Sequence, residues 1–68
     1  MKNWSLIYTT TNASEASILQ GMLQQNNIEA IVMNKQDSSY LNFGEIEIYV
    51  PFHLKDIAKY LIDNALMN

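Results

Sequence analysis

The hydrophobic pattern of this chain changes its period at Pro51, and that change limits the folds that the chain can adopt. In the preceding segment, Glu45–Val50, apolar and polar residues alternate strictly, which is typical of a β-strand with one buried face. From about His53 to Leu66, the apolar residues recur with the roughly 3.6-residue spacing of an amphipathic helix. We expect Pro51 to close the strand, because proline cannot extend the hydrogen-bond ladder.

The first part of the chain predicts another strand followed by another helix. The segment Trp4–Thr9 is rich in aromatic and β-branched residues, which favour a strand. Asn12 is followed three residues later by Glu15, a pair that resembles a capping box, so a helix is expected to begin at Ala13. Asparagine tolerates the left-handed conformation in which helices commonly end, so the pair Asn26-Asn27 is expected to end this helix.

Two apolar stripes at helical spacing indicate which faces the helices bury. The first stripe comprises Ala16, Leu19, Met22 and Leu23, with Ile18 as a further candidate, and the second comprises Leu54, Ile57, Ala58, Leu61, Ile62 and Ala65. Between the helices, a second strand is predicted at about Ile28–Met33. An irregular connection, Asn34–Gly44, leads from it to the third strand.

The order strand, helix, strand, strand, helix predicts an α+β fold of the ferredoxin-like βαββα type. Such a fold has a three-stranded antiparallel sheet with two helices on one face, and we expect one domain over residues 1–68. No residues remain for the fourth strand of the full ferredoxin-like unit, which would pair with the first strand. The free edge of the first strand therefore favours a homodimer, another homo-oligomer, or a partner that adds a strand.

Composition argues against several classes of function. Four lysines and no arginine stand against seven acidic residues, and this net charge of −3 argues against nucleic-acid binding. No apolar run reaches the roughly 20 residues of a membrane span, and no signal peptide opens the chain, so we expect a cytoplasmic protein without membrane contact. With no cysteine and one histidine, no metal site is expected, and no cofactor is predicted.

The alternation also predicts an apolar sheet face that the helices leave open. When the apolar residues of Glu45–Val50 face the helices, Tyr49 faces away, and Ile31 and Met33 on the second strand face the same way. An exposed apolar patch of this kind usually marks an interface, so Ile31, Met33 and Tyr49 are predicted to form one. The alternative is that the connection Asn34–Gly44 folds back and covers this face.

The small size of the chain adds to the case for self-association. A domain of 68 residues buries a limited share of its surface, so its stability is expected to be marginal although its 49% of hydrophobic residues is ample for a core. The phase of the first strand stays open, since either Ile7, or Leu6 together with Tyr8, joins the open face.

The connection Asn34–Gly44 is the strongest candidate for a binding site. It is longer than the roughly 2–5 residues of a usual hairpin connection, and long loops on rigid scaffolds often carry function. Its candidate binding residues are Lys35, Asp37, Ser38, Ser39 and Tyr40, which suit a small polar ligand or a protein partner. The alternative is that Asp37-Ser38-Ser39 only builds a turn through side-chain hydrogen bonds to the backbone.

Candidate catalytic residues are few. His53 has no evident orienting partner or nucleophile near it in the sequence. Glu45 and Glu47 point the same way on one strand, which more simply indicates a solvated or interface-facing side. Tyr8 and Tyr49 lie on strands that would be neighbours, as base-stacking aromatics do in RNA-binding sheets, but the basic residues are missing. No catalytic residue is predicted, and the protein is not expected to be an enzyme.

Several short motifs resemble a known family of small bacterial domains. They are Asn12-x-x-Glu15-Ala16, Gly21-Met22-Leu23, Asn27-Ile28-Glu29-Ala30, the segment Lys35–Tyr40, and the segment Gly44–Pro51. Over about residues 4–63 the chain resembles the putative prokaryotic signal-transducing proteins, a domain family of unknown function, although members often carry glycine at the position of Asn27. The resemblance implies a ferredoxin-like fold akin to the PII nitrogen-regulatory proteins, with Asn34–Gly44 where those proteins carry their effector loop.

Together, these observations predict a non-enzymatic regulatory or ligand-sensing module of signal-transducing type. It is expected to bind through the connection 34–44 and the open sheet face. The alternative is a protein-interaction adaptor that acts by edge-strand or sheet-face association. A weaker alternative is a small hydrolase that uses Asp37 or His53.

Overall fold

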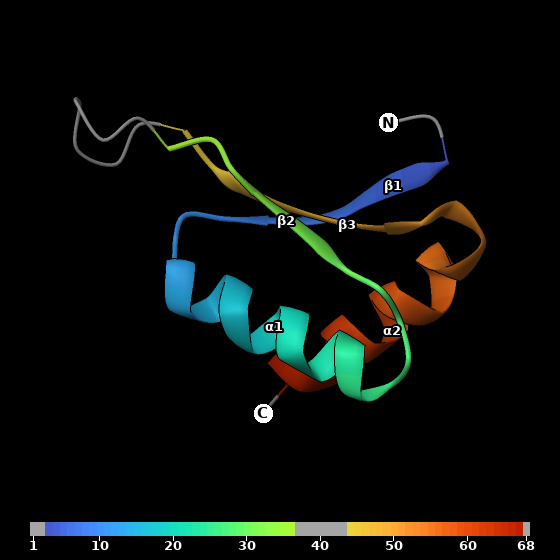
Figure 1. Ribbon diagram of the computed structural model, residues 1–68. Helices are drawn as coiled ribbons and strands as arrows, with labels where there is room; N and C mark the ends of the chain where they lie inside the picture. Colours follow the sequence, from blue (N-terminus) through green and yellow to red (C-terminus); the bar gives the residue numbers. More distant parts are fainter. Residues whose placement is uncertain (1–2, 37–43, 68) are drawn as a thin grey trace.

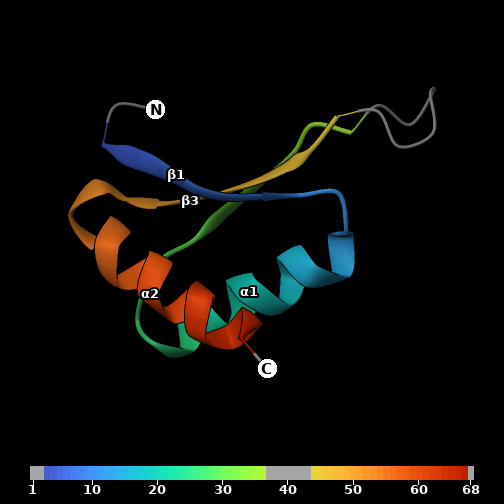
Figure 2. The same cartoon turned by 180° about the vertical axis from the view of Figure 1, so that it is seen from behind.

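The fold is a three-stranded antiparallel sheet with both helices on one face (Figures 1 and 2). The computed structural model describes residues 3–36 and 44–67. The elements are β1 (Trp4–Thr10), α1 (Ala13–Gln25), β2 (Ile31–Asn34), β3 (Ile46–Pro51), a short 3₁₀ helix η1 (Phe52–Leu54), and α2 (Lys55–Leu66). The strand order is β1-β3-β2, so β3 is central, and within the described part of the chain β1 has a free edge. The predicted α+β, ferredoxin-like βαββα arrangement is confirmed.

The core lies between the sheet and the two helices. Ile46, Ile48 and Val50 of β3 are at most 2 % exposed and face the helices, as their alternation predicts. The other buried members of the core are Ala16, Leu19, Leu23, Ile28, Ala30, Ala58 and Ile62. One contiguous cluster therefore joins the central strand to both helices.

A β-bulge at Ile7 settles the phase of β1. The pairing of β1 with β3 shifts register between Leu6, which lies opposite Tyr49, and Tyr8, which lies opposite Ile48. A bulge places two residues of one strand against one of its partner, so the side-chain alternation is interrupted there. As a result, Leu6 joins the open face while both Ile7 and Tyr8 pack against the core.

Helix α1 begins and ends where the sequence predicts. The Asn12 side chain accepts a hydrogen bond from the Glu15 backbone N–H at 3.1 Å. The Glu15 carboxylate does not complete the capping box, because it accepts a hydrogen bond from the Tyr8 hydroxyl at 3.0 Å. At the other end, Asn27 adopts a φ of 62°, the left-handed conformation expected of a helix stop.

Some predicted strand and helix boundaries are wrong. Strand β2 begins at Ile31 rather than Ile28, since its pairing with β3 begins there. Before it, the Ile28 N–H donates to the Leu23 carbonyl, and the Ala30 carbonyl accepts from the Gln20 side chain. Pro51 is the last residue of β3, a terminal position where its missing N–H is tolerated. The η1 turn precedes α2, which begins at Lys55 rather than near His53.

Parts of the predicted apolar stripes are also exposed. Ile18 on α1 is 70 % exposed and Ile57 on α2 is 52 % exposed, and Ala65 near the end of α2 is exposed as well. A stripe at helical spacing spans a broad arc of the helix surface, and only its centre contacts the sheet. The flanks of both stripes therefore face away from the core.

Candidate functional site

The face of the sheet opposite the helices gathers side chains from all three strands. The strand register places Glu47 and Tyr49 of β3 between Met33 and Ile31 of β2 and Thr9 and Leu6 of β1. Trp4, at the start of β1, lies on the same side as Leu6. We call this surface the outer sheet face and define it by Trp4, Leu6, Thr9, Ile31, Met33, Glu47 and Tyr49.

The outer sheet face is largely apolar. Leu6 is 42 % exposed and Met33 is 39 % exposed, while Trp4, Ile31 and Tyr49 are half-buried. Figures 1 and 2 show both helices on the opposite side of the sheet, and none of the described elements covers this side. Ile31, Met33 and Tyr49 therefore lie together as predicted, and their role as an interface remains a prediction.

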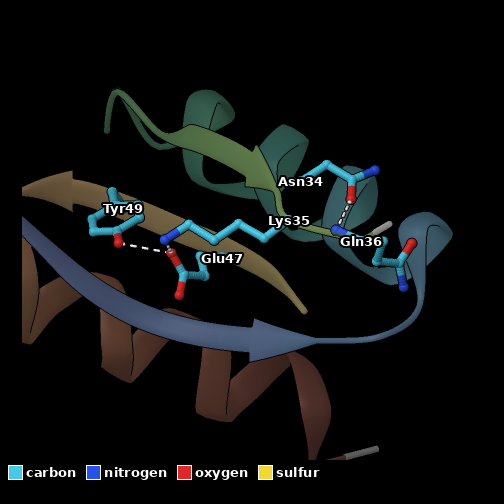
Figure 3. A network of polar contacts seen from close by, with 5 residues as sticks. All are labelled: Asn34, Lys35, Gln36, Glu47 and Tyr49. Atoms are coloured by element: carbon cyan, nitrogen blue, oxygen red, sulfur yellow. Dashed lines mark hydrogen bonds and ion pairs between the residues drawn. The ribbon is translucent and has the colours of Figure 1, made fainter. Parts of the chain in front are cut away.

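A polar cluster lies at the end of this face nearest the β2–β3 connection (Figure 3). The Lys35 Nζ lies 3.1 Å from the Glu47 Oε1 atom. The Tyr49 hydroxyl donates a hydrogen bond of 2.8 Å to the same oxygen. The Glu47 Oε1 atom therefore contacts both the Lys35 ammonium and the Tyr49 hydroxyl.

These contacts change the titration of all three groups. The pKa of Glu47 is lowered, first by the hydrogen bond from Tyr49 and then by that from Lys35, since both favour the ionised carboxylate. The pKa of Tyr49 and the pKa of Lys35 are raised, in each case chiefly by the hydrogen bond to Glu47. Glu47 and Lys35 are therefore both charged at neutral pH, and together they add no net charge to the outer sheet face.

The two ends of the β2–β3 connection are held together by backbone and side-chain contacts. The Lys35 N–H donates to the Glu45 carbonyl at 3.0 Å. The Gln36 N–H donates to the Asn34 side chain at 2.8 Å (Figure 3). The Gln36 side-chain amide donates to the Thr11 carbonyl at 2.9 Å, which ties the connection to the turn before α1. Gly44 packs closely against the Lys35 backbone with a φ of 89°.

Of the five predicted binding residues, the structure places Lys35, in the polar cluster with Glu47. Asp37, Ser38, Ser39 and Tyr40 lie outside the described residues. Gln36 was not among the predicted residues, because its partner Thr11 is 25 residues away in the sequence. The two ends of the connection therefore make hydrogen bonds that the sequence alone does not predict.

The described residues contain little that resembles a catalytic centre. His53 is exposed in η1. Within residues 3–36 and 44–67, no three histidine, aspartate or glutamate side chains gather where they could hold a metal ion. Glu47 is engaged with Lys35 and Tyr49, and Glu45 is exposed just before β3.

A second surface feature lies along the free edge of β1. A shallow groove of about 420 Å³ is lined by Leu6, Ile7, Tyr8 and Thr9 of β1 and by Lys59 of α2. We call it the edge groove. It was not predicted, because it depends on how α2 packs beside β1 rather than on either segment alone.

Comparison with known proteins gives one match. A family model described as putative prokaryotic signal transducing protein matches residues 4–65, which is nearly the whole chain. The resemblance noted from the sequence motifs is therefore confirmed. No curated protein and no solved structure matches the chain significantly.

Neither α1 nor α2, the two α-helices of the described part of the chain, is long and apolar enough to cross a membrane.

Proposed function

We propose that this chain, which belongs to the family of putative prokaryotic signal transducing proteins, is a non-enzymatic regulatory module that works as a homodimer. The outer sheet face forms the dimer interface, and the β2–β3 connection beside it binds the ligand or target. The observation that carries this proposal is the apolar outer sheet face, which no described element covers.

The apolar character of the face supports an interface. Leu6 and Met33 are exposed, and Ile31 lies beside Met33 on the same side of β2. A contiguous apolar patch on a soluble domain is unfavourable in water and is usually buried against another surface. The ten buried core residues in the described part of the chain also form a small core, and chains of this size are often stabilised by association.

The charge distribution favours a second copy as the occupant. Lys35 and Glu47 neutralise each other on the outer sheet face, so two identical faces meet without like-charge repulsion. A strongly basic or acidic partner would find no complementary net charge on this face. A second copy of the same apolar surface would bury apolar area against it.

The ligand-binding part of the proposal concerns the connection. It leaves β2 next to the polar cluster, so a ligand held by Lys35 would lie at the rim of the interface. The other predicted binding residues, Asp37, Ser38, Ser39 and Tyr40, lie outside the described residues. Binding there would be coupled to association, which is how a small module can transmit a signal. A small polar ligand should raise the melting temperature in a metabolite screen, because it binds only the folded state.

The dimer is tested by sedimentation of matched variants. Met33→Glu places a charge on the outer sheet face, and Ile57→Glu places the same charge on an exposed position of α2. We expect Met33→Glu to weaken association by about tenfold or more, which is about 1.4 kcal/mol, while Ile57→Glu leaves it unchanged. A wild-type protein that stays monomeric up to about 100 μM, or two variants that behave alike, would overturn the proposal.

A further inference from the structure

The edge groove points to a second binding surface, which adjoins the outer sheet face and shares Leu6 and Thr9 with it. Among residues 3–36 and 44–67, strand β1 has a neighbouring strand on one side only, so part of its backbone N–H and C=O groups face away from the sheet. It is the longest strand, with seven residues, and its sequence Trp4–Thr10 contains no charge and no proline. Charges and proline are the residue types that usually prevent pairing at a sheet edge.

We propose that β1 accepts a short extended segment of a partner protein, which adds a fourth strand and places an acidic side chain against Lys59. The edge groove is where this strand would lie, since it runs along Leu6–Thr9 of β1 and is bounded by Lys59 of α2. Main-chain hydrogen bonds to the free edge provide affinity in this mode of recognition, and side-chain contacts provide specificity.

Charge selects the class of segment that fits. Lys59 is exposed and is the cation that lines the groove. Among residues 3–36 and 44–67 the single ion pair is that of Lys35 with Glu47, so the Lys59 ammonium is not paired with a carboxylate there. A side chain of the added strand that faces the helices would lie beside this ammonium, and a glutamate or aspartate would complement it.

A second copy of β1 fits the groove less well. The lining residues belong to the middle of β1, so a symmetric pairing of two copies would bring both Lys59 side chains into the same groove. It would also set the bulge at Ile7 against its own copy, and a bulge interrupts a regular ladder. A short acidic segment avoids both problems, because it pairs along a few residues and supplies the opposite charge.

The probe for this proposal is a display library of random octapeptides, selected on the full chain. We expect the enriched peptides to carry β-branched or aromatic residues at every second position. They should also carry an acidic residue at one fixed position. Amide resonances of residues 6–9 should shift when an enriched peptide is added. The selection is repeated on Met33→Glu, so that loss of the proposed dimer and loss of peptide binding can be told apart.

Charge reversal provides the decisive comparison. Lys59→Glu should weaken an enriched acidic peptide by about two- to fivefold, the effect of one exposed ion pair, and should enrich basic peptides instead. Lys55→Glu changes the net charge equally, but Lys55 lies over the Phe52 ring, 4.4 Å from its centroid, so peptide binding should not change.

Other outcomes would overturn the proposal. They are the absence of enriched peptides, peptides whose shifts map away from residues 6–9, and equal effects of the two lysine variants. Shifts of the residue 6–9 amides with protein concentration alone would assign the edge to a second copy instead of a partner segment.

Discussion

At the scale of single residues, the structure requires glycine at position 44 but not at position 21. Gly44 has a φ of 89°, and a Cβ atom there would collide with the carbonyl oxygen of Lys35, whereas a Cβ at Gly21 would meet no atom within 4 Å. Gly44→Ala should therefore lower the free energy of unfolding by about 1–3 kcal/mol. Gly21→Ala should raise it by about 0.5–1 kcal/mol, because alanine favours the helix interior.

Urea unfolding of the wild type and both variants measures these two changes. Each replacement adds one methyl group, so the pair controls for the chemistry of the substitution. Changes of the same sign in both variants would contradict the conformation described for the base of the connection.

Glu47 gives a second prediction at the residue scale. Its pKa is lowered mainly by the Tyr49 hydroxyl and secondarily by Lys35. Tyr49→Phe should therefore raise the Glu47 pKa toward its ordinary value, and by more than Lys35→Gln does. Carboxyl carbon shifts of Glu47, followed by NMR against pH, measure both changes, and Tyr60→Phe on α2 is the control, since Tyr60 is 64 % exposed on another element.

The direction of the pH effect on stability follows from that lowered pKa. A carboxyl group whose pKa is lower in the folded state stabilises the fold above its unfolded pKa. This stabilisation is lost as the pH falls through the lower, folded pKa. A Glu47 pKa that stays the same in Tyr49→Phe would show that the hydrogen bond to Tyr49 does not hold the carboxylate.

At the scale of secondary-structure elements, the stability of α1 depends on Asn12, the residue that precedes the helix and caps it. The Asn12 side chain accepts the Glu15 backbone N–H, while the Glu15 carboxylate is engaged with Tyr8. Asn12→Ala should lower the free energy of unfolding by about 1 kcal/mol, the usual effect of losing a cap. Ser14→Ala, at an exposed position of the first turn, should change it by less than about 0.5 kcal/mol, and equal losses would argue against the cap.

The elements also show which features of the fold a sequence can predict. The buried face of β3 and both ends of α1 depend on local patterns, so they were predicted from alternation and from Asn12 and Asn27. The bulge at Ile7 was not, because it depends on pairing with β3. The exposure of Ile18 and Ile57 depends in the same way on how far each helix is rotated toward the sheet.

The same distinction between local patterns and tertiary packing applies to the candidate site. The alternation of β2 and β3 was enough to place Ile31, Met33 and Tyr49 on one face. The contact of Lys35 with Glu47 and that of Gln36 with Thr11 join residues far apart in sequence, so no local pattern indicates them. The edge groove requires α2 to lie beside β1, which only the packed molecule shows.

At the scale of the whole molecule, the buried apolar residues of the described part of the chain form one cluster, so the chain should unfold as one unit. Ile48 is fully buried at the centre of this cluster, and it pairs with Tyr8 on one side and Val32 on the other. A chain of 68 residues has a total stability of about 3–10 kcal/mol, so Ile48→Ala, at about 2–5 kcal/mol, should remove a large part of it.

The milder variant Ile48→Val keeps this prediction measurable in a folded protein. It should cost about 0.5–1.5 kcal/mol, while Ile57→Val, at a position that is 52 % exposed, should cost less than about 0.5 kcal/mol. Helical circular dichroism and the fluorescence of Trp4 in β1 should shift together in urea, because the sheet and the helices share one core. Separate midpoints for the two signals would show that the helices and β1 unfold independently, and the cluster would then not be the single cooperative unit of this fold.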